Sequence, residues 1–175
     1  MKMSLFTKCF VLVLILALGI ATGCIRNPDK EFGSRGQYLS IGAYRPQVLD
    51  QVVYTLQGQN YVITPQQEGT VIAVVRARAV NRNSTQVTLS VDEDAAMLRT
   101  VGGANFKPFE AEARAVETLE PAPKDNPYGS HIWGQSQILQ NFEIAGWFFF
   151  EVPEDSTFFS FAWDDVESIR VHYPQ

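Results

Sequence analysis

Hydrophobic and polar residues alternate with a period of two through most of the chain beyond residue 45, and Gly, Pro, Asn and Asp interrupt the alternation at short intervals. This period is typical of β-strands that bury one face. No amphipathic helix separates the alternating segments, so the pattern favours two packed antiparallel sheets over a parallel sheet. We therefore predict an all-β, antiparallel β-sandwich of about seven strands. The predicted strands span residues 51–56, 60–64, 70–80, 87–91, 144–152, 157–163 and 166–173.

The strand predicted over residues 70–80 changes character along its length. One of its faces is apolar throughout, while the other passes from Ile72 and Val74 to Arg76 and Arg78. This change indicates a central strand that is buried at one end and emerges into solvent at the other.

The segment between the first and last groups of strands is the hardest to assign. Residues 110–119 are rich in Ala and Glu, which favours a helix, yet their apolar spacing fits a strand nearly as well. Residues 121–133 contain several Pro, Gly, Asn and Asp residues and are predicted to form a long loop.

The first 24 residues have the three parts of an export signal. Two lysines lie near the start, an apolar run covers residues 9–21, and Thr22, Gly23 and Cys24 follow. The apolar run is shorter than the roughly 20 residues that a permanent membrane-spanning helix needs. We therefore expect residues 1–23 to be a signal peptide that is removed. An ordinary secretory signal that happens to precede a cysteine is the alternative.

Residues 20–24 resemble a bacterial lipobox, in which small residues precede a cysteine. The resemblance implies that the thiol of Cys24 receives a diacylglyceryl group and that the bond between Gly23 and Cys24 is then cut. Cys9, the other cysteine, would leave with the signal, so the mature chain could form no internal disulfide. We expect a lipoprotein held at a membrane of the cell envelope and facing the periplasm or the cell exterior, because several acyl chains make release slow.

Residues 24–44 show no sustained period and contain Pro, Gly and charged residues. We predict a flexible, lipid-anchored tether over this range, with the sandwich domain over 45–175. Twenty flexible residues span on the order of 25 Å, which would hold the domain clear of the headgroups. Part of the tether can still pack on the domain, and the candidates for this contact are Tyr38, Leu39, Ile41 and Tyr44.

Charge argues against one class of partner. Without residues 1–23 the chain keeps 12 Lys and Arg against 19 Asp and Glu, a net charge of −7. No run of basic residues follows Lys8, so we expect no nucleic acid partner.

A family resemblance covers roughly residues 47–173. It depends on a strand that ends in Asn81, a Gly102-Gly103 turn, and a strand that contains Gly146 and ends Phe-Glu-Val-Pro at Pro153. This arrangement resembles telokin-like domains, immunoglobulin-like sandwiches found in bacterial secreted lipoproteins. The chain departs from their pattern at Val101, where the family tends to have Asp, and in a long insert around residues 121–130. The resemblance implies a fold and an envelope location and transfers no active site.

Motifs for catalysis and for metal binding are largely absent. His131 and His172 are the two histidines, no Gly-x-Ser-x-Gly occurs, and the nearest approach is Gly134-Gln135-Ser136. There is no His-Glu-x-x-His, and the acidic run at 92–94 lacks the Gly that a calcium loop needs. We therefore expect no catalytic residues, no metal site and no cofactor.

Aromatic residues are concentrated in the segments 147–150 and 158–163, where they occupy both faces of each predicted strand. The pattern favours one set in the core and the other beneath the 110–138 segment. In the alternative, four rings form an exposed patch that contacts a partner. The candidate patch consists of Trp147, Phe149, Phe159 and Phe161.

Three functions stay open at this stage. We favour a non-catalytic binding or scaffolding domain that contacts an envelope protein partner. A carrier of a small or apolar ligand would need a pocket lined by several of the aromatics above. An envelope hydrolase would need His131 bonded to both a serine and a carboxylate.

Overall fold

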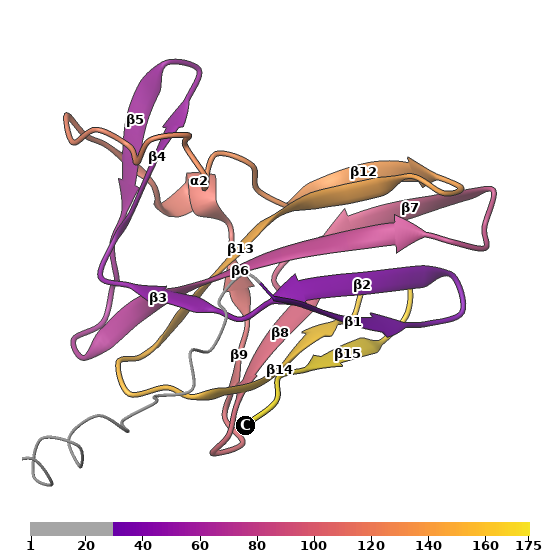
Figure 1. Cartoon of the computed structure of the whole chain (residues 1–175). Helices are drawn as coiled ribbons and strands as arrows, with labels where there is room; N and C mark the ends of the chain where they lie inside the picture. Colours follow the sequence, from indigo (N-terminus) through magenta and orange to yellow (C-terminus); the bar gives the residue numbers. More distant parts are fainter. Residues whose placement is uncertain (1–29) are drawn as a thin grey trace, which may run out of the picture.

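The computed structural model describes residues 30–175, which form fifteen β-strands and one short helix (Figure 1). The predicted all-β, antiparallel architecture is confirmed. No helix within these residues has both the length and the apolar character needed to span a bilayer. The elements in chain order are β1 (Glu31–Arg35), β2 (Leu39–Tyr44), β3 (Gln47–Leu49), β4 (Val52–Leu56), β5 (Gln59–Ile63), β6 (Thr70–Asn81), β7 (Gln86–Val91), β8 (Ala96–Thr100), β9 (Asn105–Phe106), β10 (Pro108–Phe109), α2 (Ala111–Arg114), β11 (Val116–Glu117), β12 (Gly134–Leu139), β13 (Glu143–Pro153), β14 (Phe158–Trp163) and β15 (Ile169–His172).

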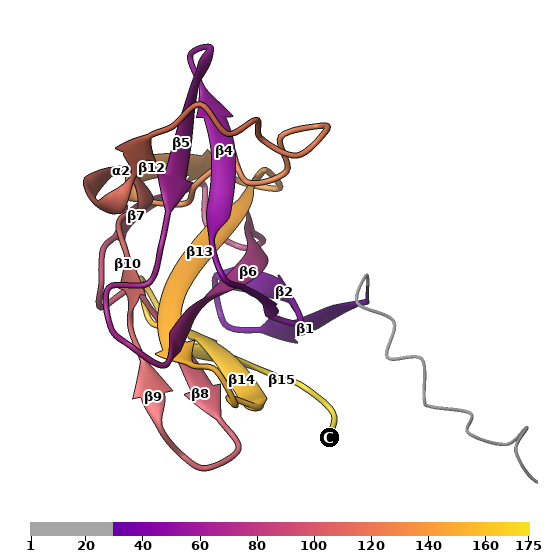
Figure 2. The ribbon, with the colours of Figure 1, turned by 90° about the vertical axis from the view of Figure 1, so that its left-hand side faces the viewer.

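The strands form four antiparallel sheets around a long central pair. β6 and β13 pair along their whole length, and with β1, β2, β3 and β10 they form the largest sheet. A four-stranded sheet (β15-β14-β8-β9) and a two-stranded sheet (β12-β7) cover one face of it. The three-stranded sheet β11-β5-β4 covers the other face, and its β4–β5 hairpin stands out at one end of the molecule (Figures 1 and 2).

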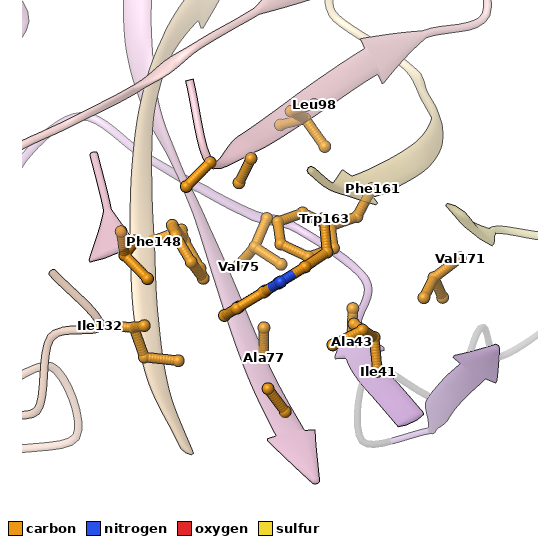
Figure 3. Close-up of a cluster of buried hydrophobic side chains, with 14 of the residues drawn as sticks. Ile41, Ala43, Val75, Ala77, Leu98, Ile132, Phe148, Phe161, Trp163 and Val171 are labelled. Atoms are coloured by element: carbon orange, nitrogen blue, oxygen red, sulfur yellow. The ribbon is translucent and has the colours of Figure 1, made fainter. Parts of the chain in front are cut away.

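The main core lies between the largest sheet and the β14 and β7 layers. The apolar face predicted for β6 points into it, as does the alternate set of β13 residues that includes Phe148 and Phe150. Figure 3 shows Trp163 of β14 lying among Val75, Phe148 and Phe161. The Phe148 and Trp163 rings meet edge to face at a centroid distance of 5.8 Å, an arrangement that aromatic rings favour.

A second, smaller core lies on the opposite face of the same two strands. Ile72 and Val74 of β6, together with Trp147 and Phe149 of β13, pack beneath the β4–β5 hairpin and α2. One strand pair is therefore buried on both faces at this end, where β6 has no charged residues.

The alternative prediction, that the four aromatic residues form an exposed patch, is wrong. Phe149 is 1% exposed and Phe161 0% exposed, and Trp147 is 9% exposed, whereas Phe159 is 37% exposed. Phe161 lies in the main core and Phe149 in the smaller one, so the sheets separate them. The reason is physical, because Trp147 and Phe149 lie on the face of β13 that the β4–β5 hairpin covers, whereas Phe161 lies on β14, which packs against the opposite face.

The predicted tether is too long. Residues 31–44 form β1 and β2, which pair with each other, and β2 also pairs with β6 from Leu39 to Ala43. Leu39 and Ile41 are buried, as the packing alternative expected, while Tyr38 is exposed and Tyr44 half-buried. Part of the range 24–44 thus belongs to the domain, which begins at Glu31 or earlier.

The ambiguous segment 110–119 contains both kinds of structure. Its helix, α2, has four residues, and Val116 and Glu117 then form a short strand against β5. Residues 121–133 form the predicted loop, apart from one bridge between His131 and Trp147. Strands β1, β2, β3, β8, β9, β10 and β12 were not predicted.

A largely buried ion pair connects the smaller core to the loop before β6. The Glu151 carboxylate accepts hydrogen bonds from the backbone amides of Gln66 and Gln67, both at 2.8 Å, and from Thr70 Oγ1 at 2.7 Å. Arg114 Nη2 lies 2.5 Å from its other oxygen. Burial disfavours the charged carboxylate, but these hydrogen bonds outweigh burial and hold the pKa of Glu151 below its usual value.

We expect Phe149→Ala to lower the free energy of unfolding by about 3–5 kcal/mol, because it leaves a cavity in a closed cluster. Phe159→Ala removes the same ring from an exposed position and should cost less than about 1 kcal/mol. Urea unfolding of both variants measures the difference. Equal losses would contradict the assignment of the two rings.

The Glu151 carboxylate should also make stability depend on pH. A depressed folded-state pKa contributes stability above the unfolded value of 4.5, and this contribution is lost as the pH falls further. We expect Glu151→Gln to cost about 3–5 kcal/mol at pH 7, because Arg114 is left without its carboxylate partner. The variant should lose less further stability than the parent between pH 5 and pH 3. Glu154→Gln, at an exposed turn, is the matched control, and an identical pH profile for both variants would count against the ion pair.

Candidate binding groove

A break in the pairing along β6 opens space beside Arg76. β2 pairs with β6 as far as Ala43 and Ala77, and β3 resumes the pairing at Gln47 and Val74. Three residues, 44–46, therefore lie opposite two residues of β6, as in a β-bulge. Tyr44 has no partner on β6 and lies against Arg76, with the guanidinium carbon 5.4 Å from the ring centre.

The opposite wall is the loop that precedes β12, and it is held directly against β13. The Trp147 amide donates to the Ser130 carbonyl at 2.9 Å, and the Ile132 amide donates to the Trp147 carbonyl at 3.2 Å. Gly146 permits this contact, since a Cβ there would lie 2.7 Å from the Ser130 carbonyl oxygen. The glycine therefore serves close approach of two backbones.

Aromatic contacts connect the two walls. Tyr128 meets Trp147 edge to face at 4.9 Å between ring centres. Its hydroxyl donates to Gln47 Oε1 on β3 at 3.0 Å. Tyr128 thus spans from the loop to the strand beside the pairing break.

The result is a groove on the outer side of the largest sheet. Its volume is about 240 Å³, and it adjoins a second hollow of about 320 Å³ with which it shares Arg76, Pro127 and Trp147. A larger depression of about 450 Å³ lies near Gly102 but is shallower, and its one charged side chain is Asp155. We name the first hollow the Arg76 groove; its lining residues are Tyr44, Arg45, Gln47, Arg76, Pro127, Tyr128 and Trp147.

Two arginines on the same face of β6 differ in their electrostatic surroundings. Arg78 Nε lies 2.5 Å from a carboxylate oxygen of Glu31, and its Nη1 lies 2.9 Å from Glu143. These carboxylates raise the pKa of Arg78. Arg76 is exposed and makes no ion pair with any of residues 30–175. The N–H donors of its guanidinium are therefore not bound to a carboxylate of these residues and can bind an anionic partner.

His131 forms a β-bridge with Trp147 of the groove, and its ring lies against two aromatic rings. Its ring meets Tyr54 and Phe149 edge to face at 4.8 and 5.2 Å, and Nε2 is buried without a hydrogen-bond partner among the described residues. Burial lowers its pKa, although a hydrogen bond with the Tyr128 backbone and the charge of Glu112 act in the opposite direction. Among residues 30–175, no serine or carboxylate side chain is bonded to it, as a hydrolase would need.

The site residues predicted from the sequence lie in different parts of the structure or outside the described residues. Gly23 and Cys24 lie outside the described residues. Of the four aromatics, Trp147 lines the Arg76 groove, whereas Phe149 and Phe161 are enclosed and Phe159 packs on His172 at 5.1 Å. Ser136 lies on β12, paired with Leu89 of β7. Residues 30–175 contain no cluster of three or more His, Cys, Asp or Glu side chains that could hold a metal ion.

Sequence reasoning missed Arg45 and Tyr128 as groove residues. The one available signal was the outward position of Arg76 on a strand that becomes polar. The other lining residues come from segments at least 29 residues away from Arg76 in the chain, and their meeting depends on the pairing break and on Gly146.

Two solved structures are similar to the chain. One is that of ycdA, a candidate lipoprotein of Bacillus subtilis, with 11% sequence identity and a TM-score of 0.48 over 83% of this chain and 39% of that one. This chain therefore spans about two fifths of its length. The other is that of MPT63, a secreted protein of Mycobacterium tuberculosis, with 15% identity and a TM-score of 0.41 over 83% of this chain and 94% of that one. No protein-family model and no curated protein matches the sequence. Neither similarity transfers a site or an activity.

The lowered pKa of His131 should appear as a loss of stability on mild acidification. The folded state binds this proton less readily than the unfolded chain, whose histidine has a pKa of 6.5, so stability falls as the pH drops through 6.5. We expect His131→Phe to remove this component between pH 7.5 and pH 5.5 in urea unfolding. His172→Phe, at an exposed position on β15, leaves the contribution of His131 in place. A His131→Phe variant with the full dependence of the parent would exclude His131 as its source.

Proposed function

We propose that the chain is a lipid-anchored protein of a bacterial-type cell envelope. Residues 1–23 act as the signal, and Cys24 carries the acyl chains that hold the domain at a membrane surface. The observation that carries this proposal is the run Ala-Thr-Gly-Cys at 21–24, directly after a short apolar segment. Cys24 would be the one thiol of the mature chain, because Cys9 lies within the signal.

The exported domain, in this proposal, works by surface contact with another envelope component and not by catalysis. The Arg76 groove supports a binding role, because it places an arginine without a carboxylate partner between aromatic walls. The hydrolase alternative is less well supported, since His131 lies against two aromatic rings and not beside a serine and a carboxylate of the described residues. The carrier alternative needed several of the four aromatics in one pocket, and only Trp147 lies in the groove.

We also propose that the domain is immunoglobulin-like and of the telokin-like kind. Three positions fit that pattern. Asn81 ends β6 and is buried, with its amide donating to the carbonyls of Ser84 and Ile138 at 2.8 and 2.9 Å. Pro153 ends β13, and Gly146 lies within it. The buried Asn81 amide satisfies one carbonyl in the turn after β6 and one on β12, which is a physical reason for an Asn at this position.

The test of the anchor is the chemical state of position 24. Intact-mass analysis of the protein isolated from a lipoprotein-processing host should give residues 24–175 plus two or three acyl chains. Cys24→Ser should retain residues 1–23 and lack lipid, because the thiol is the acylated group. Cys9→Ser is the matched control and should be processed like the parent. A mature chain with a free thiol at Cys24, or one that begins at another residue, would refute the proposal.

A further inference from the structure

The start of β1 sets how far the domain can stand from its anchor. Lys30 is the first described residue and lies six positions after Cys24. An extended chain covers at most about 3.6 Å per residue, so this segment reaches at most about 22 Å. A tether over the whole range 24–44 would have a much longer maximum reach, about 70 Å for twenty extended residues. The surface around Lys30 must therefore stay close to whatever membrane holds Cys24.

That surface carries the Arg76 groove. Lys30 and Arg45 both lie over the ring of Phe32, at 5.4 and 5.5 Å from its centre. Glu31 pairs with Tyr44, which in turn contacts Arg76. A continuous set of contacts thus connects the point where the chain enters the domain to the groove, and it brings three basic residues together.

The charges of this surface differ from those of the whole domain. A net charge of −7 gives the mature chain no general attraction to an anionic membrane. Near the groove, however, the carboxylates of Glu31 and Glu143 are both bound to Arg78. Arg45 donates to the Pro174 carbonyl and makes no ion pair among the described residues. The basic residues here, which are Lys30, Arg45, Arg76 and Arg78, therefore outnumber the two glutamates on the surface next to Lys30, the first described residue.

The groove also has the chemistry that suits a lipid headgroup. Guanidinium groups bind phosphate oxygens through paired hydrogen bonds. Tyr and Trp side chains favour the membrane interface, where one part of the ring is in contact with apolar groups and the other with water. Arg45 and Arg76 supply the first kind of group, and Tyr44, Tyr128 and Trp147 supply the second.

We propose that the Arg76 groove binds the phosphate of an anionic lipid headgroup in the same membrane that holds the acyl chains of Cys24. This inference rests on the proposed lipid anchor. Headgroup binding would hold the domain in one orientation, with the groove facing the bilayer. The acyl chains supply permanent attachment, and the groove supplies orientation. Tethering makes a weak headgroup contact sufficient, because the second binding event is intramolecular.

The test separates the groove from the anchor. The mature chain, residues 24–175 with Cys24→Ser, carries no lipid, and its cooperative unfolding is checked by circular dichroism first. Co-sedimentation is then measured with vesicles of phosphatidylcholine alone and with vesicles that contain phosphatidylglycerol. We expect binding to the anionic vesicles and none to the neutral ones, with binding weakened by added salt.

Variants assign the binding to the groove. Each basic residue near an anionic surface contributes about fivefold, so Arg76→Gln should weaken the partition coefficient about fivefold and Arg45→Gln with Arg76→Gln about 25-fold. Arg99→Gln with Arg170→Gln removes the same charge from exposed positions on β8 and β15 and should change binding less than about twofold. Arg76→Lys keeps the charge but not the paired hydrogen bonds of the guanidinium, so it should recover only part of the binding that Arg76→Gln loses.

The outcomes that would contradict headgroup binding differ from those that would contradict acylation of Cys24. Absence of binding to anionic vesicles, equal binding to neutral ones, or equal losses in the two double variants would each overturn headgroup binding. So would a cross-link from the groove to an envelope protein with no vesicle binding, which would assign the groove to a protein partner. The acylation of Cys24 is measured independently by mass, so either proposal can fail alone.

Discussion

The pairing of β6 with β13 is the constraint on which the rest of the structure depends. The two strands are in register from Thr70 opposite Pro153 to Val80 opposite Glu143. Because side chains alternate across a strand, one ladder presents two apolar surfaces at its buried end. The β14 and β7 layers cover one surface, and the β4–β5 hairpin with α2 covers the other. Two cores of different size thus share one wall.

The same ladder explains why the groove forms where it does. At the end near Arg78 the outer face of β6 carries charge and cannot be covered by an apolar layer. The covering hairpin ends before this point, and the 121–133 loop crosses to β13 at Gly146. The groove is therefore the boundary between the part of the face that is buried and the part that is solvated. Arg76 and Trp147 are directly paired across the two strands at this boundary.

Carboxylates bind one of two neighbouring arginines and not the other, and this difference determines the electrostatics of the groove. Arg78 and Arg76 are two residues apart on one face, yet two glutamates bind the first and an aromatic ring contacts the second. A guanidinium over a ring is stabilised without losing its hydrogen-bond donors. With the anchor proposed at Cys24, such a group beside the entry of the chain would give an acidic domain one surface suited to an anionic partner.

The sequence by itself determined the class of the fold and most of its long strands. The alternation in 70–80 is local and has a period of two, so it identifies both the strand and the residue, near Arg76, where it becomes polar. The motif on which the proposed lipid anchor depends is likewise a contiguous signal. Only the tertiary structure decided that residues 31–44 pair into a sheet, since their Gly-rich pattern has no clear period until Leu39 and Ile41 contact β6 and the core. It also decided that Phe149 is covered while Trp147 reaches the groove, because that depends on which distant segment packs over each ring.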